Sequence, residues 1–199
     1  MIGSEAPCGV DWLIGLIPDP IRFPVSPVVS EKPNKRSMKS TETEPRLLLL
    51  GIGNLLMGDE GVGVHAARRL ADQDLPPGVA VLDGGTGGFH LMEYFERYPR
   101  MIMIDATLDQ RPPGTIRLLR PRFTPDFPKA MSTHDIGLKD LVEGLSILGR
   151  LPDIHLFAVS IERIQPMHIG LSDPLEAVMP DLLERVRTLA GQLQTAEVA

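Results

Sequence analysis

Residues 51–63 have the sequence GIGNLLMGDEGVG, which follows the apolar run LLLL and precedes the helix-like run VHAARRLADQ. A strand, a glycine-rich turn and a helix in this order are typical of α/β folds that bind nucleotides. In those folds the turn holds a phosphate at the N-terminus of the helix. Here Asp59 and Glu60 stand at that place. The stretch predicts an α/β fold but leaves open whether its loop holds an anion or a cation.

The two carboxylates favour the cation. A dinucleotide fingerprint needs a third glycine where this chain has Leu56, and no Walker lysine follows the loop. Two like charges at the helix N-terminus would repel a phosphate, whereas the helix dipole stabilises them in their ionised form. The ionised carboxylate is also the form that binds metal. A nucleotide-binding protein is therefore the weaker hypothesis.

The rest of the chain alternates between two patterns. Continuous apolar runs predict strands buried on both faces, and amphipathic runs predict helices. The expected strands are 46–52, 79–83, 101–106, 114–120 (an edge strand) and 154–162. The expected helices are 60–73, 89–97, 134–149 and 172–193, the last with Ser172 as N-cap and Pro180 as a kink or break. The alternation predicts a three-layer α/β sandwich, with a twisted, mostly parallel sheet and helices on both faces.

Ligands of such sheets bind beyond the C-terminal ends of the strands. These ends are followed here by 53–60, 83–88, 105–107 and the residues from 162 onward. Asp105 ends the apolar strand MIMI, and His134 opens a helix in STHDIG. Together with Glu60 they form a set of two carboxylates and one imidazole, which suits zinc, nickel, iron or manganese. We therefore expect Glu60, Asp105 and His134 to bind one metal ion.

Each of these residues also has a purely structural interpretation. Glu60 fits a first-turn helix acid, Asp105 a turn residue and His134 the exposed start of a helix. Asp59 is expected to cap its helix, with support of a metal ligand as the alternative. Asp135 either orients His134 or is another first-turn acid. The glycines of DGGTGG, 83–88, are expected to shape the rim of a cleft, with Asp83 as anchor. Only the fold can gather groups so far apart in sequence.

The bulk composition separates a tail from a domain. Residues 1–45 contain seven of the nineteen prolines and no regular period, which predicts a disordered N-terminal tail, with Met38 as an alternative start. The domain is expected at 46–195. The net charge of −6 argues against nucleic acid as a partner, and no apolar run is long enough to span a bilayer. The single cysteine, Cys8, fits a reducing compartment. We expect a cytoplasmic monomer.

Four runs resemble a known family in their order and spacing: GIGNLLMGDEGVG, DGGTGG, IDA and STHDIGL. The family is the hydrogenase maturation proteases, endopeptidases that trim the C-terminus of the large subunit of nickel–iron hydrogenases. The resemblance extends over about residues 46–193 and implies the same α/β fold. It implies that Glu60, Asp105 and His134 are the metal-binding residues. It also implies that the metal is nickel already bound in the hydrogenase precursor, so that cleavage follows nickel insertion.

Two forms of the chemistry follow from these residues. A metal held by three protein ligands keeps open positions, from which it can polarise a carbonyl and activate water. Alternatively, a carboxylate activates the water as in aspartic peptidases, with Asp105 as the base and Glu60 as the second catalytic residue. A related peptidase with another protein substrate is one alternative function. A non-catalytic, nickel-sensing module that binds the precursor like a chaperone is the other.

Overall fold

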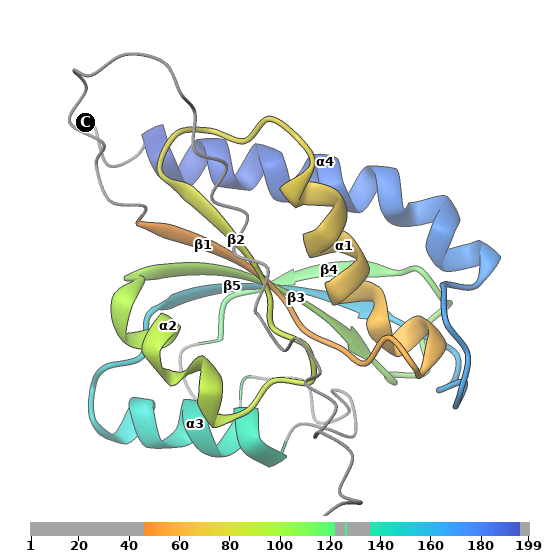
Figure 1. The fold of residues 1–199 in the computed structure, drawn as a ribbon, viewed down its shortest axis with the longest axis horizontal. Helices are drawn as coiled ribbons and strands as arrows, with labels where there is room; N and C mark the ends of the chain where they lie inside the picture. Colours follow the sequence, from red (N-terminus) through yellow and green to blue (C-terminus); the bar gives the residue numbers. More distant parts are fainter. Residues whose placement is uncertain (1–45, 122–125, 127–135, 196–199) are drawn as a thin grey trace, which may run out of the picture.

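The computed structural model describes residues 46–121, 126 and 136–195. Its centre is a five-stranded sheet in the order β2-β1-β3-β5-β4 (Figure 1). The strands are β1 (Leu47–Gly51), β2 (Val79–Asp83), β3 (Arg100–Thr107), β4 (Ile116–Leu119) and β5 (Asp153–Ser160). Neighbouring strands are parallel except at the edge, where β4 runs antiparallel to β5. The mostly parallel sheet and the edge position of β4 are confirmed.

Helices cover both faces of this sheet (Figure 1). They are α1 (Val62–Ala71), α2 (Met92–Arg97), α3 (Ile136–Ile147) and α4 (Asp173–Thr195), with short 3-10 helices η1 (Gly58–Gly61) and η2 (Phe89–Leu91) ahead of α1 and α2. One core lies between the sheet and α1 and α4, and a second lies between the sheet and α2 and α3. The three-layer α/β sandwich is therefore confirmed.

The helices form where the sequence repeats its apolar residues at helical spacing. In α1, Val62, Ala66 and Leu70 are fully buried and form one stripe against the sheet. The predicted helix 60–73 is divided, because its first turn is the 3-10 helix η1 and the α-helix begins at Val62. Helix α4 continues through Pro180, so this proline does not break it. None of the helices in the described ranges is long and apolar enough to cross a membrane.

The order in which successive strands join the sheet reverses beside β1: β2 lies on one side of β1 and β3 on the other. From β1 it passes through α1 to β2 on one face, and from β2 it returns through α2 to β3 on the opposite face. A crevice forms at such a switch point, between the C-terminal ends of the two strands that flank it. Here those strands are β1 and β3. They are the strands that precede Glu60 and end near Asp105.

Predictions on the remaining residues lie outside the described part of the chain. The tail 1–45, the alternative start at Met38 and most of the proline-rich loop before α3 are among them. The monomeric state and the cytoplasmic location also stay predictions.

A buried histidine of the core should make the stability of the fold depend on pH. His155 of β5 is 4% exposed, and burial lowers the pKa of its imidazole, an effect that Asp153 opposes and Arg120 and Arg100 reinforce. The unfolded chain, with a histidine pKa of about 6.5, then binds the proton more readily than the folded chain. Stability should be complete above that pH and should fall as the pH is lowered. Urea unfolding at about pH 7.5 and 5.5 should show a smaller loss in His155→Leu than in the unmodified chain; an equal loss would contradict this assignment.

Candidate functional site

The loop after β1 folds back so that Glu60 lies inside the molecule. Gly53 donates its N–H to the carbonyl of Gly85 at 2.8 Å, which joins this loop to the loop after β2. A Cβ on Gly53 would lie 2.1 Å from the carbonyl oxygen of Glu60, and Gly53 has a φ of +145°. Only glycine permits this close return of the chain. Glu60 follows in η1, with an exposed fraction of 0%.

A second pair of glycines sets how closely α1 approaches the sheet. A Cβ on Gly51 would lie 2.0 Å from the carbonyl oxygen of Gly63, and a Cβ on Gly63 would lie 2.1 Å from that of Ile104. Gly63 therefore lets the helix pack closely against the strand. In the nucleotide-binding fingerprint the third glycine has this role. The spacing of that fingerprint predicts this glycine at position 56, where the chain has Leu56. The glycine is instead part of the run GVG at 61–63.

Asp105 lies on β3 with an exposed fraction of 1%, and its Oδ1 accepts the N–H of Ala106 at 2.7 Å. Because side chains alternate along a strand, Asp105 projects to the same face as Met101 and Met103, which belong to the core under α2 and α3. Helix η1, which carries Glu60, packs against β3. The structure thus brings the segments of Glu60 and Asp105 together at the switch point.

The third expected ligand, His134, lies outside the described residues, as does Asp135. Helix α3 begins two residues after His134 and contributes Leu138 to the core on the face to which Asp105 projects. Among the described residues alone, no three His, Cys, Asp or Glu side chains could hold a metal ion. The described residues do supply two carboxylates at the expected place, and their oxygens suit a hard or borderline cation. The ligand role of Glu60, Asp105 and His134 stays a prediction.

Asp59 has a different role from the expected one. No side-chain hydrogen bond caps η1 or α1. Instead, Asp59 Oδ2 accepts Gln165 Nε2 at 2.9 Å and Ser172 Oγ at 2.8 Å, while Oδ1 accepts the Ser172 N–H at 2.7 Å. The Asp59 N–H donates to Gln165 Oε1 at 2.9 Å. The buried carboxylate of Asp59 therefore joins the loop of Glu60 to the connection between β5 and α4, 161–172.

The loop after β2 is hydrogen-bonded to the segment that follows β1. Asp83 anchors it as expected, because its Oδ1 accepts the N–H of Gly85 at 3.0 Å and its Oδ2 accepts Arg68 Nε at 2.8 Å. Gly85, Gly87 and Gly88 all have positive φ values. The DGGTGG run is therefore a tight glycine loop beside the loop of Glu60, consistent with its expected place at a rim.

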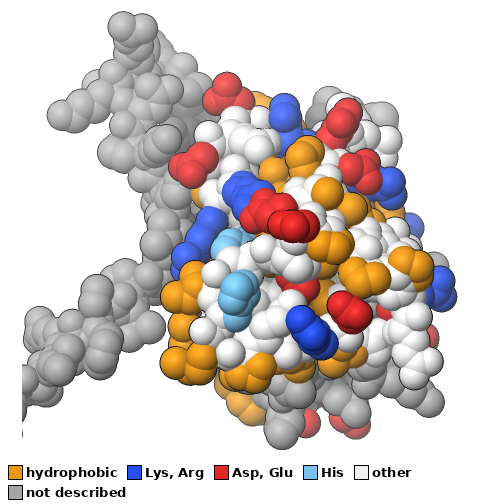
Figure 2. All heavy atoms as spheres, turned by 90° about the vertical axis from the view of Figure 1, so that its right-hand side faces the viewer, with side chains coloured by type: hydrophobic (Ala, Val, Ile, Leu, Met, Phe, Trp, Pro, Cys, Tyr) orange, Lys and Arg blue, Asp and Glu red, His pale blue; other side chains and the backbone are white. Residues whose placement is uncertain are grey.

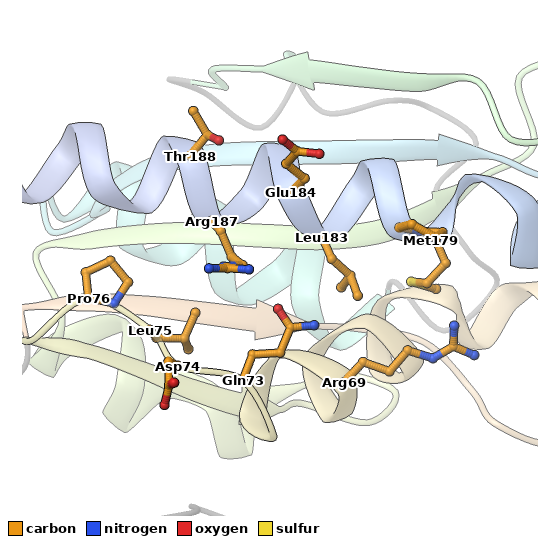
Figure 3. A pocket seen from close by; sticks show the side chains of 11 residues that line it. Arg69, Gln73, Asp74, Leu75, Pro76, Met179, Leu183, Glu184, Arg187 and Thr188 are labelled. Atoms are coloured by element: carbon orange, nitrogen blue, oxygen red, sulfur yellow. The ribbon is translucent and has the colours of Figure 1, made fainter.

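A groove of about 840 Å³ lies elsewhere, between α1 and α4 (Figure 3). Arg69, Gln73, Leu183 and Arg187 are among its lining residues. Arg69 is already engaged with Glu176 through two hydrogen bonds of 2.7 and 2.9 Å. None of the lining residues belongs to 52–60, to β3 or to 161–172. The groove is therefore separate from the candidate site at the strand ends.

Comparison with known proteins finds matches among the hydrogenase maturation proteases. A family model described as hydrogenase maturation protease matches residues 64–189. The hydrogenase 2 maturation protease of Escherichia coli is 37% identical over 145 residues, which cover 71% of this chain and 88% of the relative. The solved structure of the hydrogenase maturating endopeptidase HybD from E. coli matches with a TM-score of 0.67 and 34% identity, covering 74% of this chain and 93% of its own. The maturation protease HybD of Thermococcus kodakarensis matches with a TM-score of 0.59 and 30% identity. This match covers 73% of this chain and 99% of the solved chain.

Proposed function

Because this chain belongs to the hydrogenase maturation protease family, a family of peptidases, we propose that it removes the C-terminal extension of a nickel–iron hydrogenase large-subunit precursor after nickel insertion. In this proposal the nickel belongs to the substrate and is recognised there by Glu60, Asp105 and His134. The partner is the precursor, and no nickel need reside in the free enzyme. Other divalent metals with similar ligand preferences are expected to substitute.

The proposal rests on the burial of two carboxylates at the C-terminal ends of neighbouring strands. Glu60 and Asp105 are almost completely inaccessible to solvent. Burial of carboxylates opposes folding unless they are paired, hydrogen-bonded or coordinated. Groups of this kind concentrate at functional sites, where their charge is used. Their position at the switch point is where a sheet of this topology binds its ligand.

The chemistry required is hydrolysis of one peptide bond. Water adds to the carbonyl carbon, the C–N bond breaks, and the proton lost by the water ends on the leaving amine. We assign Asp105 the role of accepting and returning that proton, with Glu60 as the second carboxylate of the site. The substrate's nickel would supply polarisation of the carbonyl if it lies against the scissile bond. The aspartic-type and metal-assisted versions differ only in which group activates the water.

The test is trimming of the precursor in its two metal states. Purified chain is incubated with nickel-loaded and nickel-free precursor, and the mass of the large subunit is followed. Trimming of only the loaded form is expected. Trimming of both forms would overturn nickel recognition but leave the peptidase activity. Tight binding without trimming would favour the chaperone-like alternative instead.

A further inference from the structure

The connection between β5 and α4, residues 161–172, forms one unit with the loop that carries Glu60. Met57 and His168 form a parallel bridge. His168 donates its N–H to the carbonyl of Leu56 at 3.2 Å, and Gly58 donates its N–H to the carbonyl of His168 at 2.9 Å. The side chain of Asp59 adds its bonds to Gln165 and Ser172. Backbone and side-chain contacts therefore hold the two segments together as one wall of the candidate site.

This wall carries three large apolar side chains on its outside. Leu56 is 49% exposed, Met167 is 85% exposed and Ile169 is 73% exposed. Leu56 and Met167 immediately precede the bridged residues Met57 and His168, and Ile169 directly follows His168, so all three lie on the two joined segments. We call these three residues the apolar ridge. The strand ends and this wall face the viewer in Figure 2, where hydrophobic side chains are exposed beside histidine and charged groups.

The exposed side chain of Met167 stands on a backbone whose conformation is fixed by hydrogen bonds. Met167 has a φ of +58°, in the left-handed region that non-glycine residues rarely adopt. The backbone bonds on both sides of it maintain this conformation, and the side chain gains no burial in return. Strained backbone of this kind concentrates at functional sites, and exposed apolar groups that lie together mark interaction surfaces.

We infer that the apolar ridge is the docking surface for an apolar segment of the protein substrate that lies next to the scissile bond. The inference rests on the proposed function. The ridge lies on the two segments that adjoin the candidate site, since Asp59 bonds to Gln165 and Ser172 of the wall and Glu60 is the next residue. None of the three ridge side chains carries a charge, so the segment they fit is apolar. The unbranched side chain of Met167 adapts its shape to such a segment.

Two substitutions test the ridge, with a matched pair as control. Met167→Ser/Ile169→Ser removes two exposed apolar side chains from the ridge. Ile147→Ser/Leu148→Ser removes two others, 80% and 66% exposed, at the C-terminal end of α3, which points away from the strand ends (Figure 1). Initial rates of trimming are measured against the concentration of nickel-loaded precursor. The ridge variant should raise KM about tenfold or more with kcat nearly unchanged, and the control should match the unmodified chain.

A third variant separates docking from folding. Met167→Gly relieves the left-handed conformation, so its melting temperature should be unchanged or higher, yet its KM should rise. An unchanged KM in both ridge variants would overturn the inference. A fall in kcat at constant KM, or a KM change in proportion to lost stability, would overturn it as well. Failure of the proposed function is distinguishable, because then the unmodified chain and the α3 control would not trim the precursor at all.

Discussion

Glu60→Gln and Asp105→Asn should each reduce the rate of precursor trimming by about a hundredfold or more, while the chain stays folded. Each change keeps the size of the side chain but removes the charge that would bind a cation or accept a proton. Glu60 follows the C-terminal end of β1 and Asp105 lies near that of β3, and both side chains are fully or almost fully buried. Because an amide of the same shape fits the same space, the fold should survive. His134→Ala, at the third expected ligand, should have the same effect on trimming.

The control is an exposed carboxylate that lies outside the proposed site. Glu143 is an exposed residue of α3. Glu143→Gln should therefore trim at the normal rate. Circular dichroism and thermal melting of all four variants would establish that they are folded. Normal trimming by the Glu60, Asp105 and His134 variants together would show that the site has been assigned to the wrong residues.

Gly63→Ala should destabilise the fold by about 3 kcal/mol or more, because the added methyl group has no space. Its Cβ would lie 2.1 Å from the carbonyl oxygen of Ile104 and 2.3 Å from that of Ile52. Ile52 also donates its N–H to the Ile104 carbonyl at 2.9 Å, so the methyl group would press on the contact between the ends of β1 and β3. Helix α1 must then move away from the sheet, and the loop of Glu60 must move with it.

A second helical glycine provides the comparison for this prediction. Gly144 lies inside α3, and a Cβ there would meet nothing within 4 Å. Gly144→Ala should stabilise the fold by about 0.5–1 kcal/mol, since alanine loses less backbone entropy on forming a helix. Urea unfolding of both variants measures the difference. Similar effects of the two substitutions would show that close packing at Gly63 does not limit the fold.

Most of the secondary structure could be predicted from the sequence, because burial leaves a local signature. The run LLLL predicted a strand covered on both faces, and β1 is buried along its whole length. The strands at 79–83 and 101–106 matched β2 and β3 to within one residue at each end. The alternation of strands and helices predicted the layers, and the rule on strand ends predicted the region of Glu60 and Asp105.

The partners of the loop residues could not be predicted in the same way. Asp59 was expected to cap its helix, since an acid before a helical run usually does. Its contacts with Gln165 and Ser172 span 106 and 113 residues of sequence. Met167 and Ile169 stand in a loop, where exposed residues have no period. Contacts of this kind depend on how distant loops meet above the sheet, and no local pattern records that.

The sequence by itself determined the α/β class, the family and the strand ends near which Glu60 and Asp105 lie, because periodic burial and short motifs are recorded in neighbouring residues. Only the tertiary structure decided that Gly63 sets the approach of α1 to β3, that Asp59 joins two loops and that the apolar side chains of these loops stay exposed. The physical reason is that these features arise from contacts between segments that only the completed sheet brings together.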